Sequence, residues 1–188
     1  MMQRSYSGNF IAIDTETTGI CCSNSEIIEV GAVRFSDWEP EAEFSTLIKP
    51  KGEIPYRITE ITGINMSMVQ NSPYFEDILE QLWEFIGDLP VVGHNLGFDL
   101  SFLKAQGCDI EGNGNECIDT LCLSNKIKGP SSVWDPVLKK RVYDYNGCEV
   151  MNHKLGTMCR YFGISLENAH RAADDAKAAG LLLKALVK

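Results

Sequence analysis

Apolar residues follow two spacings along the chain, and together these predict an alternation of strands and helices. Short apolar runs that end in turn-forming or charged residues predict strands at 9–14, 26–35, 43–49 and 90–93. Apolar residues three and four positions apart predict helices at about 73–86, 97–106, 119–127, 153–162 and 172–187. Strands come first and then mix with helices, which is typical of an α/β fold with helices layered on a mixed sheet. We expect a single domain over residues 1–188.

The segment 128–152 departs from this alternation. Asn146-Gly147 lies between β-prone residues and favours a hairpin, because a type I′ turn needs positive φ at both central positions. We therefore expect an inserted hairpin that carries Lys139, Lys140 and Arg141. An ordinary surface excursion without a function is the alternative.

Composition changes this picture little. Hydrophobic residues make up 44% and charged residues 23% of the 188 residues, which is ordinary for a globular protein. No apolar run approaches the ~18 residues that a membrane span needs, and residues 1–9 do not resemble a secretory signal. We therefore expect a cytoplasmic protein with no membrane partner. The seven cysteines are odd in number and irregular in spacing, which fits a reducing compartment and favours neither disulfides nor structural zinc.

Candidate chemistry begins at the end of the first predicted strand. Asp14 and Glu16 are two positions apart, so that on a strand both carboxylates project to one face. Two such carboxylates repel each other unless a cation lies between them. A metal site is one interpretation, and a solvated turn after the strand is the other, because this tripeptide pattern is common.

Asp99 and Asp175 are candidates of the same kind on two predicted helices. Asp99 shares the apolar face of its helix, although an aspartate near a helix start also favours the helix dipole, and taken singly this structural interpretation is the stronger one. Asp175 is centred on the apolar face of 172–187, whereas its neighbour Asp174 lies ~100° away, towards solvent. An unpaired carboxylate on a buried face is costly, and Arg171 is the only basic residue within a turn on that face. These positions favour a metal ion over a salt bridge for Asp175.

His170 precedes the last predicted helix. It reaches the carboxylates only from the loop, because on the helix it would face away from Asp175. Histidine has an ordinary pKa near ~6.5, which suits a general base that takes a proton from an attacking water. A surface histidine at a helix start is the alternative.

The donor atoms point to one reaction class. Oxygen ligands without cysteine or histidine favour Mg²⁺ or Mn²⁺ over zinc, and two such ions assist an in-line displacement at phosphorus. The chain has no P-loop, no G-x-S-x-G elbow and no G-x-G-x-x-G fingerprint, so other chemistries have little support.

Three segments together resemble the motifs of the DEDD exonuclease superfamily, histidine branch. In matching order and with matching separations, they are Asp14-x-Glu16-Thr-Thr-Gly, His94-Asn95-x-x-Phe98-Asp99 and His170-x4-Asp175. The likeness covers about 9–187, and it also includes Gly31-Ala32-Val33, Asp119-Thr120-Leu121 and His153-Lys154-Leu155. The chain is similar to the proofreading epsilon subunit of bacterial DNA polymerase III and to the exonuclease domain of the Gram-positive replicative polymerase.

The resemblance implies a ribonuclease-H-like fold with a five-stranded mixed sheet. It implies a 3′→5′ exonuclease that releases nucleoside 5′-monophosphates from nucleic-acid ends, most simply from single-stranded DNA. It implies four ligands for two Mg²⁺ or Mn²⁺ ions, namely Asp14, Glu16, Asp99 and Asp175, with His170 as the general base. By the same likeness, four residues border the terminal nucleotide: Thr17, Gly19, Ile20 and Phe98. His94 and His153 have structural positions, and the segment 128–152 is longer than the family pattern.

The net charge of −9 is unusual for a protein that handles a polyanion, and two divalent ions would reduce it only to −5. We therefore expect binding through the metals and a small pocket rather than a grip on long duplex. The densest basic cluster is 139–141, which suggests an arm that guides the 5′ part of the strand; a bystander role is the alternative. The chain ends directly after its last predicted helix, which favours a free-standing monomer and leaves contact with a DNA polymerase open.

Two rival functions follow from the same residues. An RNA-trimming or short-oligonucleotide exonuclease is the first, because no residue reveals whether a 2′-hydroxyl is accepted. An inactive polymerase-binding module with the same fold is the second, and the five intact catalytic positions disfavour it.

Overall fold

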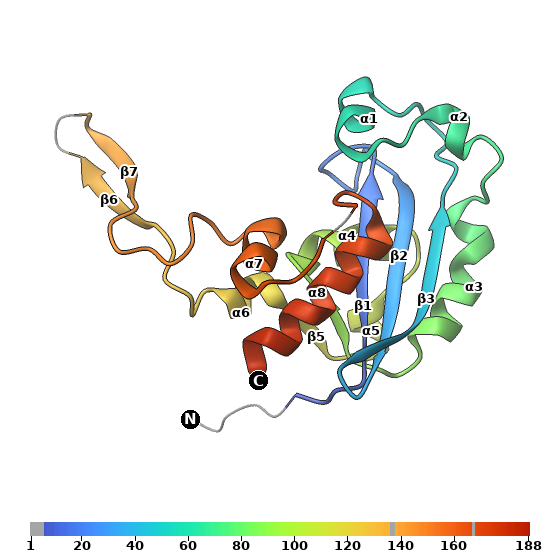
Figure 1. Ribbon diagram of the computed structural model, residues 1–188. Coiled ribbons are helices and arrows are strands. Elements are labelled where there is room, and N and C mark those ends of the chain that lie inside the picture. Colours follow the sequence, from blue (N-terminus) through green and yellow to red (C-terminus); the bar gives the residue numbers. More distant parts are fainter. Residues whose placement is uncertain (1–5, 136–137, 167) are drawn as a thin grey trace.

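The computed structural model describes residues 6–135, 138–166 and 168–188 of the chain. Within these residues, five strands form one mixed sheet in the order β3-β2-β1-β4-β5, and two more form a separate hairpin (Figure 1). The strands of the sheet are β1 (Phe10–Thr17), β2 (Ile27–Ser36), β3 (Glu39–Leu47), β4 (Val91–Gly93) and β5 (Cys117–Asp119). Strands β1, β2 and β3 are antiparallel neighbours, whereas β4 and β5 run parallel to β1.

Helices cover both faces of this sheet. In the described residues they are α1 (Tyr56–Thr62), α2 (Met66–Val69), α3 (Phe75–Ile86), α4 (Leu96–Ala105), α5 (Ile110–Asn113), α6 (Thr120–Ser124), α7 (Leu155–Phe162) and α8 (Ala172–Val187). The long helix α8 crosses one face of the sheet (Figure 1). One core cluster joins α3 and α4 to the sheet, and a second joins α8 to it.

Strand β1 is buried from both sides. Ile11 and Ile13 pack in the cluster that contains α3 and α4, whereas Phe10 and Ala12 pack with α8. Because both faces are covered, the strand has a continuous apolar run instead of an alternating pattern. The alternation continues beyond Ile13, so the next polar residues are distributed between the two faces as well.

The predicted α/β architecture is confirmed, and the predicted long elements agree in order and type with ends that differ by a few residues. Helix α8 covers 172–187, the range that the periodicity predicts. Four short elements are not predicted by the sequence pattern, namely α1, α2, α5 and β5. Each has seven residues or fewer, which is too short for a periodicity to be visible.

The predicted hairpin is present, but its predicted turn is wrong. Strands β6 (Ser131–Asp135) and β7 (Lys140–Asp144) pair with each other, and residues 136–137 of the loop between them lie outside the described residues. Asn146-Gly147 follows β7 instead, in a turn in which the Cys148 N–H donates to the Tyr145 carbonyl at 3.3 Å. The residues after this turn cannot pair with β7, because the Glu149 N–H donates to the Lys128 carbonyl at 2.7 Å.

Helix α8 approaches β2 more closely than a side chain would allow. A Cβ at Gly31 would lie 2.1 Å from the Ala173 nitrogen and 2.2 Å from the Ala172 carbonyl carbon. A Cβ at Gly180, farther along the helix, would lie 2.3 Å from the Phe35 ring. Both ends of the contact therefore need glycine. The contact at Gly31 sets the position of the first turn of α8.

Two further features bear on the environment of the chain. All seven cysteines are free thiols, of which Cys108 and Cys159 are buried. Among the helices of the described residues, no helix combines the length and the apolar character that crossing a membrane requires.

We predict that Gly31→Ala destabilises the protein by about 2 kcal/mol or more, because an added methyl group must push the α8 backbone away from the sheet. Gly97→Ala is the matched control. Its Cβ meets no atom within 4 Å, so that the alanine should leave stability unchanged or raise it by ~0.5–1 kcal/mol in helix α4. Urea denaturation of both variants measures the difference. Equal stability of the two variants would contradict the close approach.

Candidate active site

Four carboxylates from three elements meet at the carboxyl end of β1. Asp14 and Glu16 lie on β1, Asp99 lies in the first turn of α4, and Asp175 lies in the first turn of α8. The parallel pairing of β1 with β4 carries α4 to this end of the sheet, since α4 begins directly after β4. The fold therefore brings together residues that are as far apart as 14 and 175.

Thr15 connects β1 to the buried carboxylate of α4. The Thr15 N–H donates to Asp99 Oδ1 at 2.9 Å, and the Thr15 hydroxyl donates to the same oxygen at 2.7 Å. Asp99 is only 3% exposed. The threonine between Asp14 and Glu16 is thus bonded to the third carboxylate of the cluster, which fixes α4 against the strand.

The loop before α8 supplies the second side of the site. Glu16, His170 and Asp175 each offer one ligand atom, and these atoms lie within 4.8 Å of one another. The backbone N–H of His170 donates to Asp175 Oδ2 at 3.1 Å. Asp175 Oδ1, in contrast, is buried and has no hydrogen-bond partner among the described residues. Such an unpaired buried oxygen is costly unless a further group binds it.

His170 has an unusual backbone conformation. Its φ of +69° lies in the left-handed region, which few residues other than glycine adopt, although histidine, asparagine and aspartate do so more often than most. Its side chain is exposed, as a histidine in the loop rather than on the helix would be. The turn therefore directs the ring towards Glu16 and Asp175 at a small cost in backbone strain.

An ion pair that the sequence patterns do not identify holds this loop. The Arg171 guanidinium donates to both oxygens of Glu29 at 2.7–3.2 Å, and the Ala172 N–H donates to Glu29 Oε2 at 3.1 Å. Glu29 is 1% exposed and lies opposite Glu16 in the pairing of β1 with β2. A charged residue inside the apolar run of 27–30 is the signal that could have revealed it. Arg171 thus stabilises a fifth carboxylate and fixes the residue next to His170.

Burial and mutual repulsion shift the pKa values of the cluster upwards. Burial, then repulsion by Asp175 and other carboxylates, raises the pKa of Glu16 to about 8. Burial raises the pKa of Asp99 to about 7, against the opposing effect of the Thr15 hydrogen bonds. Burial and the charges of Asp99 and Asp175 raise the pKa of Asp14 well above its usual range. Burial also raises the pKa of Asp175.

These shifts and the unpaired Asp175 oxygen fit a divalent cation. Oxygen donors in a partly buried cluster of negative charge match Mg²⁺ or Mn²⁺, and a cation would reverse the cause of the raised pKa values. The residues present therefore suit the metal that the sequence patterns predict.

The four residues expected around a terminal nucleotide have different surroundings. Thr17 is buried and its hydroxyl donates to the Gly19 carbonyl at 2.6 Å, which closes the turn after β1. Ile20 is 90% exposed on that turn, unusually open for a large apolar side chain. Phe98 is half-buried beside Asp99, and its ring lies 4.9 Å from that of Phe102. In the sequence, Thr17, Gly19 and Ile20 follow Glu16 closely, and Phe98 directly precedes Asp99. Each of the four residues is therefore near one of the carboxylates along the chain.

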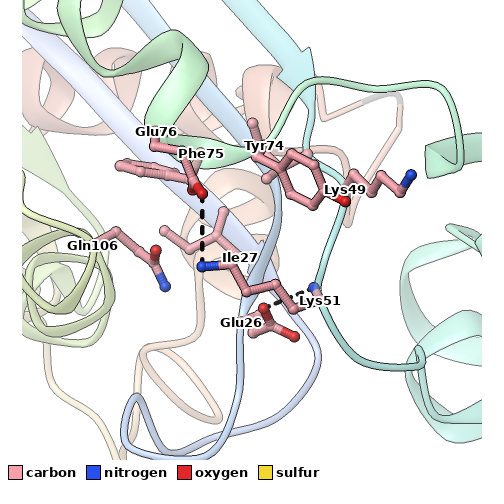
Figure 2. A pocket seen from close by; sticks show the side chains of 9 residues that line it. Glu26, Ile27, Lys49, Lys51, Tyr74, Phe75, Glu76 and Gln106 are labelled. Atoms are coloured by element: carbon pink, nitrogen blue, oxygen red, sulfur yellow. Dashed lines mark hydrogen bonds and ion pairs between the residues drawn. The ribbon is translucent and has the colours of Figure 1, made fainter.

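A cleft opens next to His170 and Asp175. It has a volume of ≈ 360 Å³, and the N-terminal part of α7 forms much of its wall. Its lining includes two cations, Lys154 and Arg160, in addition to His170 and Asp175. The pocket in Figure 2 is different, since its ≈ 10 Å³ holds about one water and it contains none of the four clustered carboxylates. There Glu26 accepts the Lys51 backbone N–H at 2.9 Å. This region is therefore a contact between loops rather than a site for a ligand.

His94 and His153 have structural contacts. The two nitrogens of His94 lie 2.9 Å from the Thr120 hydroxyl and 2.8 Å from the His153 carbonyl oxygen. His153 Nε2 lies 3.1 Å from the Ile127 carbonyl oxygen. The two histidines thus connect the end of β4 to α6 and to the segment before α7.

Comparisons with known proteins place the chain in a family. The family described as Exonuclease (RNase_T) matches residues 11–183. A protein of Clostridium perfringens named DNA polymerase III PolC-type is 38% identical over 183 residues, which are 97% of this chain and 11% of that protein. The chain thus spans about a tenth of that relative.

Two solved structures share the fold. Exonuclease X in complex with 5′ overhanging duplex DNA has a TM-score of 0.67 at 20% identity, covering 94% of this chain and 90% of that one. Escherichia coli exonuclease I in complex with a dT13 oligonucleotide has a TM-score of 0.70 at 16% identity, covering 96% and 41%. The five-stranded mixed sheet flanked by helices is accordingly the ribonuclease-H-like fold that the resemblance implies.

The raised pKa values predict how stability depends on pH when metal is removed. The folded chain holds protons on Glu16 and Asp99 that the unfolded chain releases above about pH 4, so stability falls as pH rises towards the folded pKa values of about 7 and 8. In EDTA the Tm should therefore decrease from pH 6 to pH 9. Mg²⁺ should raise Tm most at pH 9, where the carboxylates are charged. Thermal melts at four pH values test this, and a Tm in EDTA that is constant or rising would contradict it.

Proposed function

Because this chain belongs to the RNase_T exonuclease family, we propose that it is a 3′→5′ exonuclease that releases nucleoside 5′-monophosphates from single-stranded DNA ends. The observation that carries the proposal is the unpaired, buried Asp175 oxygen within a cluster of four carboxylates. The DNA polymerase III PolC-type relative and the DNA-bound structures that share the fold favour DNA as the substrate.

The carboxylate cluster would hold two Mg²⁺ or Mn²⁺ ions. The ligands that we assign are Asp14, Glu16, Asp99 and Asp175. When bound, such ions stabilise negative charge on the attacking and leaving oxygens of a phosphodiester. Thr15 orients Asp99 through two hydrogen bonds, and His170 orients Asp175 through its N–H.

His170 is the general base in this proposal. Its ring lies beside Glu16 and Asp175 and is exposed, so a water that enters the site can give it a proton. The Glu29–Arg171 ion pair fixes the backbone one residue away, which limits the positions that the ring can take. The ring remains able to release the proton to solvent.

The surroundings of the cluster suit a strand end. The exposed Ile20 side chain and the half-buried Phe98 ring offer apolar surfaces on which the terminal base and sugar can lie, with Thr17 and Gly19 forming the turn between β1 and Ile20. Lys154 and Arg160 add positive charge to the wall of the cleft beside His170, where a phosphate of the strand would otherwise meet only acidic groups.

Partners follow from the same reasoning. We propose single-stranded 3′ ends as the nucleic-acid partner and a DNA polymerase as a protein contact, since the similar segment of the PolC-type relative lies within a polymerase. A monomer in the cytoplasm is proposed as well, and the seven free thiols suit a reducing compartment.

Digestion of end-labelled oligonucleotides tests the activity. With Mg²⁺ or Mn²⁺, the protein should shorten single-stranded DNA from the 3′ end and release 5′-monophosphates, and EDTA should abolish this. A parallel series on RNA of the same sequence measures the preference for DNA. Undiminished activity in EDTA, or 3′-phosphate products, would end the two-metal proposal.

Two neighbouring aspartates provide a matched pair of variants. Asp175→Asn should lower turnover by several orders of magnitude, because a charged ligand becomes neutral. Asp174→Asn should stay within about tenfold, since the Asp174 carboxylate is directed to the loop before α8, where it accepts the Asn168 side-chain N–H at 3.0 Å. Single-turnover rates with saturating Mg²⁺ and thermal melts of both variants separate catalysis from folding. A dead Asp174→Asn with an active Asp175→Asn would reverse the assignment.

A further inference from the structure

Positive charge is concentrated in one part of this acidic chain. Residues 126–160, here called the basic segment, contain seven Lys or Arg and three Asp or Glu. The other residues contain ten Lys or Arg and twenty-three Asp or Glu. The basic segment comprises the β6–β7 hairpin and most of α7. The part of the chain best suited to a polyanion therefore includes the hairpin, which extends away from the main sheet (Figure 1).

One face of the hairpin carries exposed aromatic rings. In the register of β6 with β7, Trp134 lies opposite Arg141 and Ser132 lies opposite Tyr143, so these four residues share a face. Trp134 and Tyr143 are 60% and 66% exposed. The ring of Tyr145 continues the row, with its centroid 6.5 Å from that of Tyr143. We call Trp134, Arg141, Tyr143 and Tyr145 the aromatic face.

Arg141 lies within this row. One of its guanidinium nitrogens donates to the Ser132 carbonyl at 2.9 Å, so the side chain reaches across the face from the position opposite Trp134 towards Tyr143. Its neighbour Lys140 points to the other face, where it lies opposite Asp135. The aromatic face thus combines rings with a cation, whereas the other face has its cation opposite a carboxylate.

We propose that the aromatic face binds the 5′ part of a single-stranded nucleic acid by stacking of bases on its rings, while Arg141 contacts the phosphates. Residues of one face recur about every 7 Å along a strand, so that successive rings can accept successive bases of an extended strand. Stacking on aromatic rings with interleaved arginine is a common mode of binding single strands without sequence preference. The inference deepens the proposed function, on which it rests, by adding a remote binding site for the same substrate.

The base of the hairpin is joined to the wall of the catalytic cleft. The Glu149 carboxylate accepts the Lys128 N–H at 3.1 Å and the Tyr161 hydroxyl at 2.8 Å, which joins the hairpin's two connections to α7. Helix α7 in turn contributes Arg160 to the cleft that contains His170. In Figure 1, α7 lies between the hairpin and α8, so a strand that leaves the cleft along α7 runs towards the hairpin.

The rings favour this occupant over a second copy of the chain. A second copy is also acidic, with a net charge of −9, but it offers no unpaired bases for the rings. A single strand offers both phosphates for Arg141 and flat apolar surfaces for Trp134 and Tyr143.

Substitutions on the two faces of the hairpin test the proposal. The probes are dT12 and the p-nitrophenyl ester of thymidine 5′-monophosphate, which is too short to reach the hairpin. Trp134→Ala with Tyr143→Ala should raise KM on dT12 by roughly tenfold or more, with kcat and all constants on the ester unchanged. Arg141→Ala should raise KM on dT12 and reduce its salt dependence, whereas Lys140→Ala, which removes the same charge from the opposite face, should have a smaller effect.

Binding measured without turnover completes the test. In EDTA, fluorescence anisotropy should show that a 12-mer with abasic sites in its 5′ half binds the wild type as weakly as dT12 binds the double variant. An unchanged KM in the double variant, an equal loss for Arg141→Ala and Lys140→Ala, or a parallel loss on the ester would each overturn the proposal. A change of oligomeric state with unchanged dT12 binding would assign the face to a second copy and overturn it as well. Absence of ester and dT12 hydrolysis in the wild type would instead contradict the proposed function, and the anisotropy comparison would still decide the binding site.

Discussion

Repulsion among carboxylates at the end of β1 is the constraint on which the rest of this structure depends. Five acidic side chains from four elements meet there. Four of them have raised pKa values, and the fifth, Glu29, has the Arg171 guanidinium against both of its oxygens. Packing alone would favour keeping these carboxylates apart, because burial disfavours each charged form and repulsion between neighbouring charges adds to the free-energy cost. Instead, backbone N–H groups of Thr15, His170 and Ala172 donate to the cluster and hold it together.

The close contact between α8 and β2 follows from that constraint. Asp175 can lie near Glu16 only if the first turn of α8 lies directly on the sheet, and Gly31 provides the space. Glu29 then meets Arg171 and the Ala172 N–H at the beginning of the helix. Packing, the ion pair and the carboxylate cluster are therefore parts of one arrangement, and a change in any of them affects the others.

The sequence predicts the long elements and the side of α8 on which Asp175 lies, because both depend on periodicities that extend over many residues. Asp175 and Asp174 are both only partly buried, although Asp175 Oδ1 is buried. The sequence also contains the three motifs in order, but it does not reveal that Thr15 bonds to Asp99, since that contact joins residues 84 positions apart. The ion pair of Glu29 with Arg171 is not predicted for the same reason, because its two residues come together only in the folded chain. The wrong turn at Asn146-Gly147 has a different cause. A local turn preference was overridden by the hydrogen bonds between 149–150 and Lys128, which no local pattern contains.

The two hydrogen bonds from Thr15 to Asp99 also have a kinetic consequence. The Thr15 amide can exchange with solvent deuterium only when α4 separates from β1. Its exchange therefore reports on the opening of the whole site rather than on the motion of a single carboxylate side chain. Among the described residues, the β6–β7 hairpin has no strand pairing with the central sheet, and its amides belong to a unit that can open by itself while the carboxylate cluster stays closed. The chain thus combines a catalytic end that opens cooperatively with a peripheral element whose fluctuations leave that end intact.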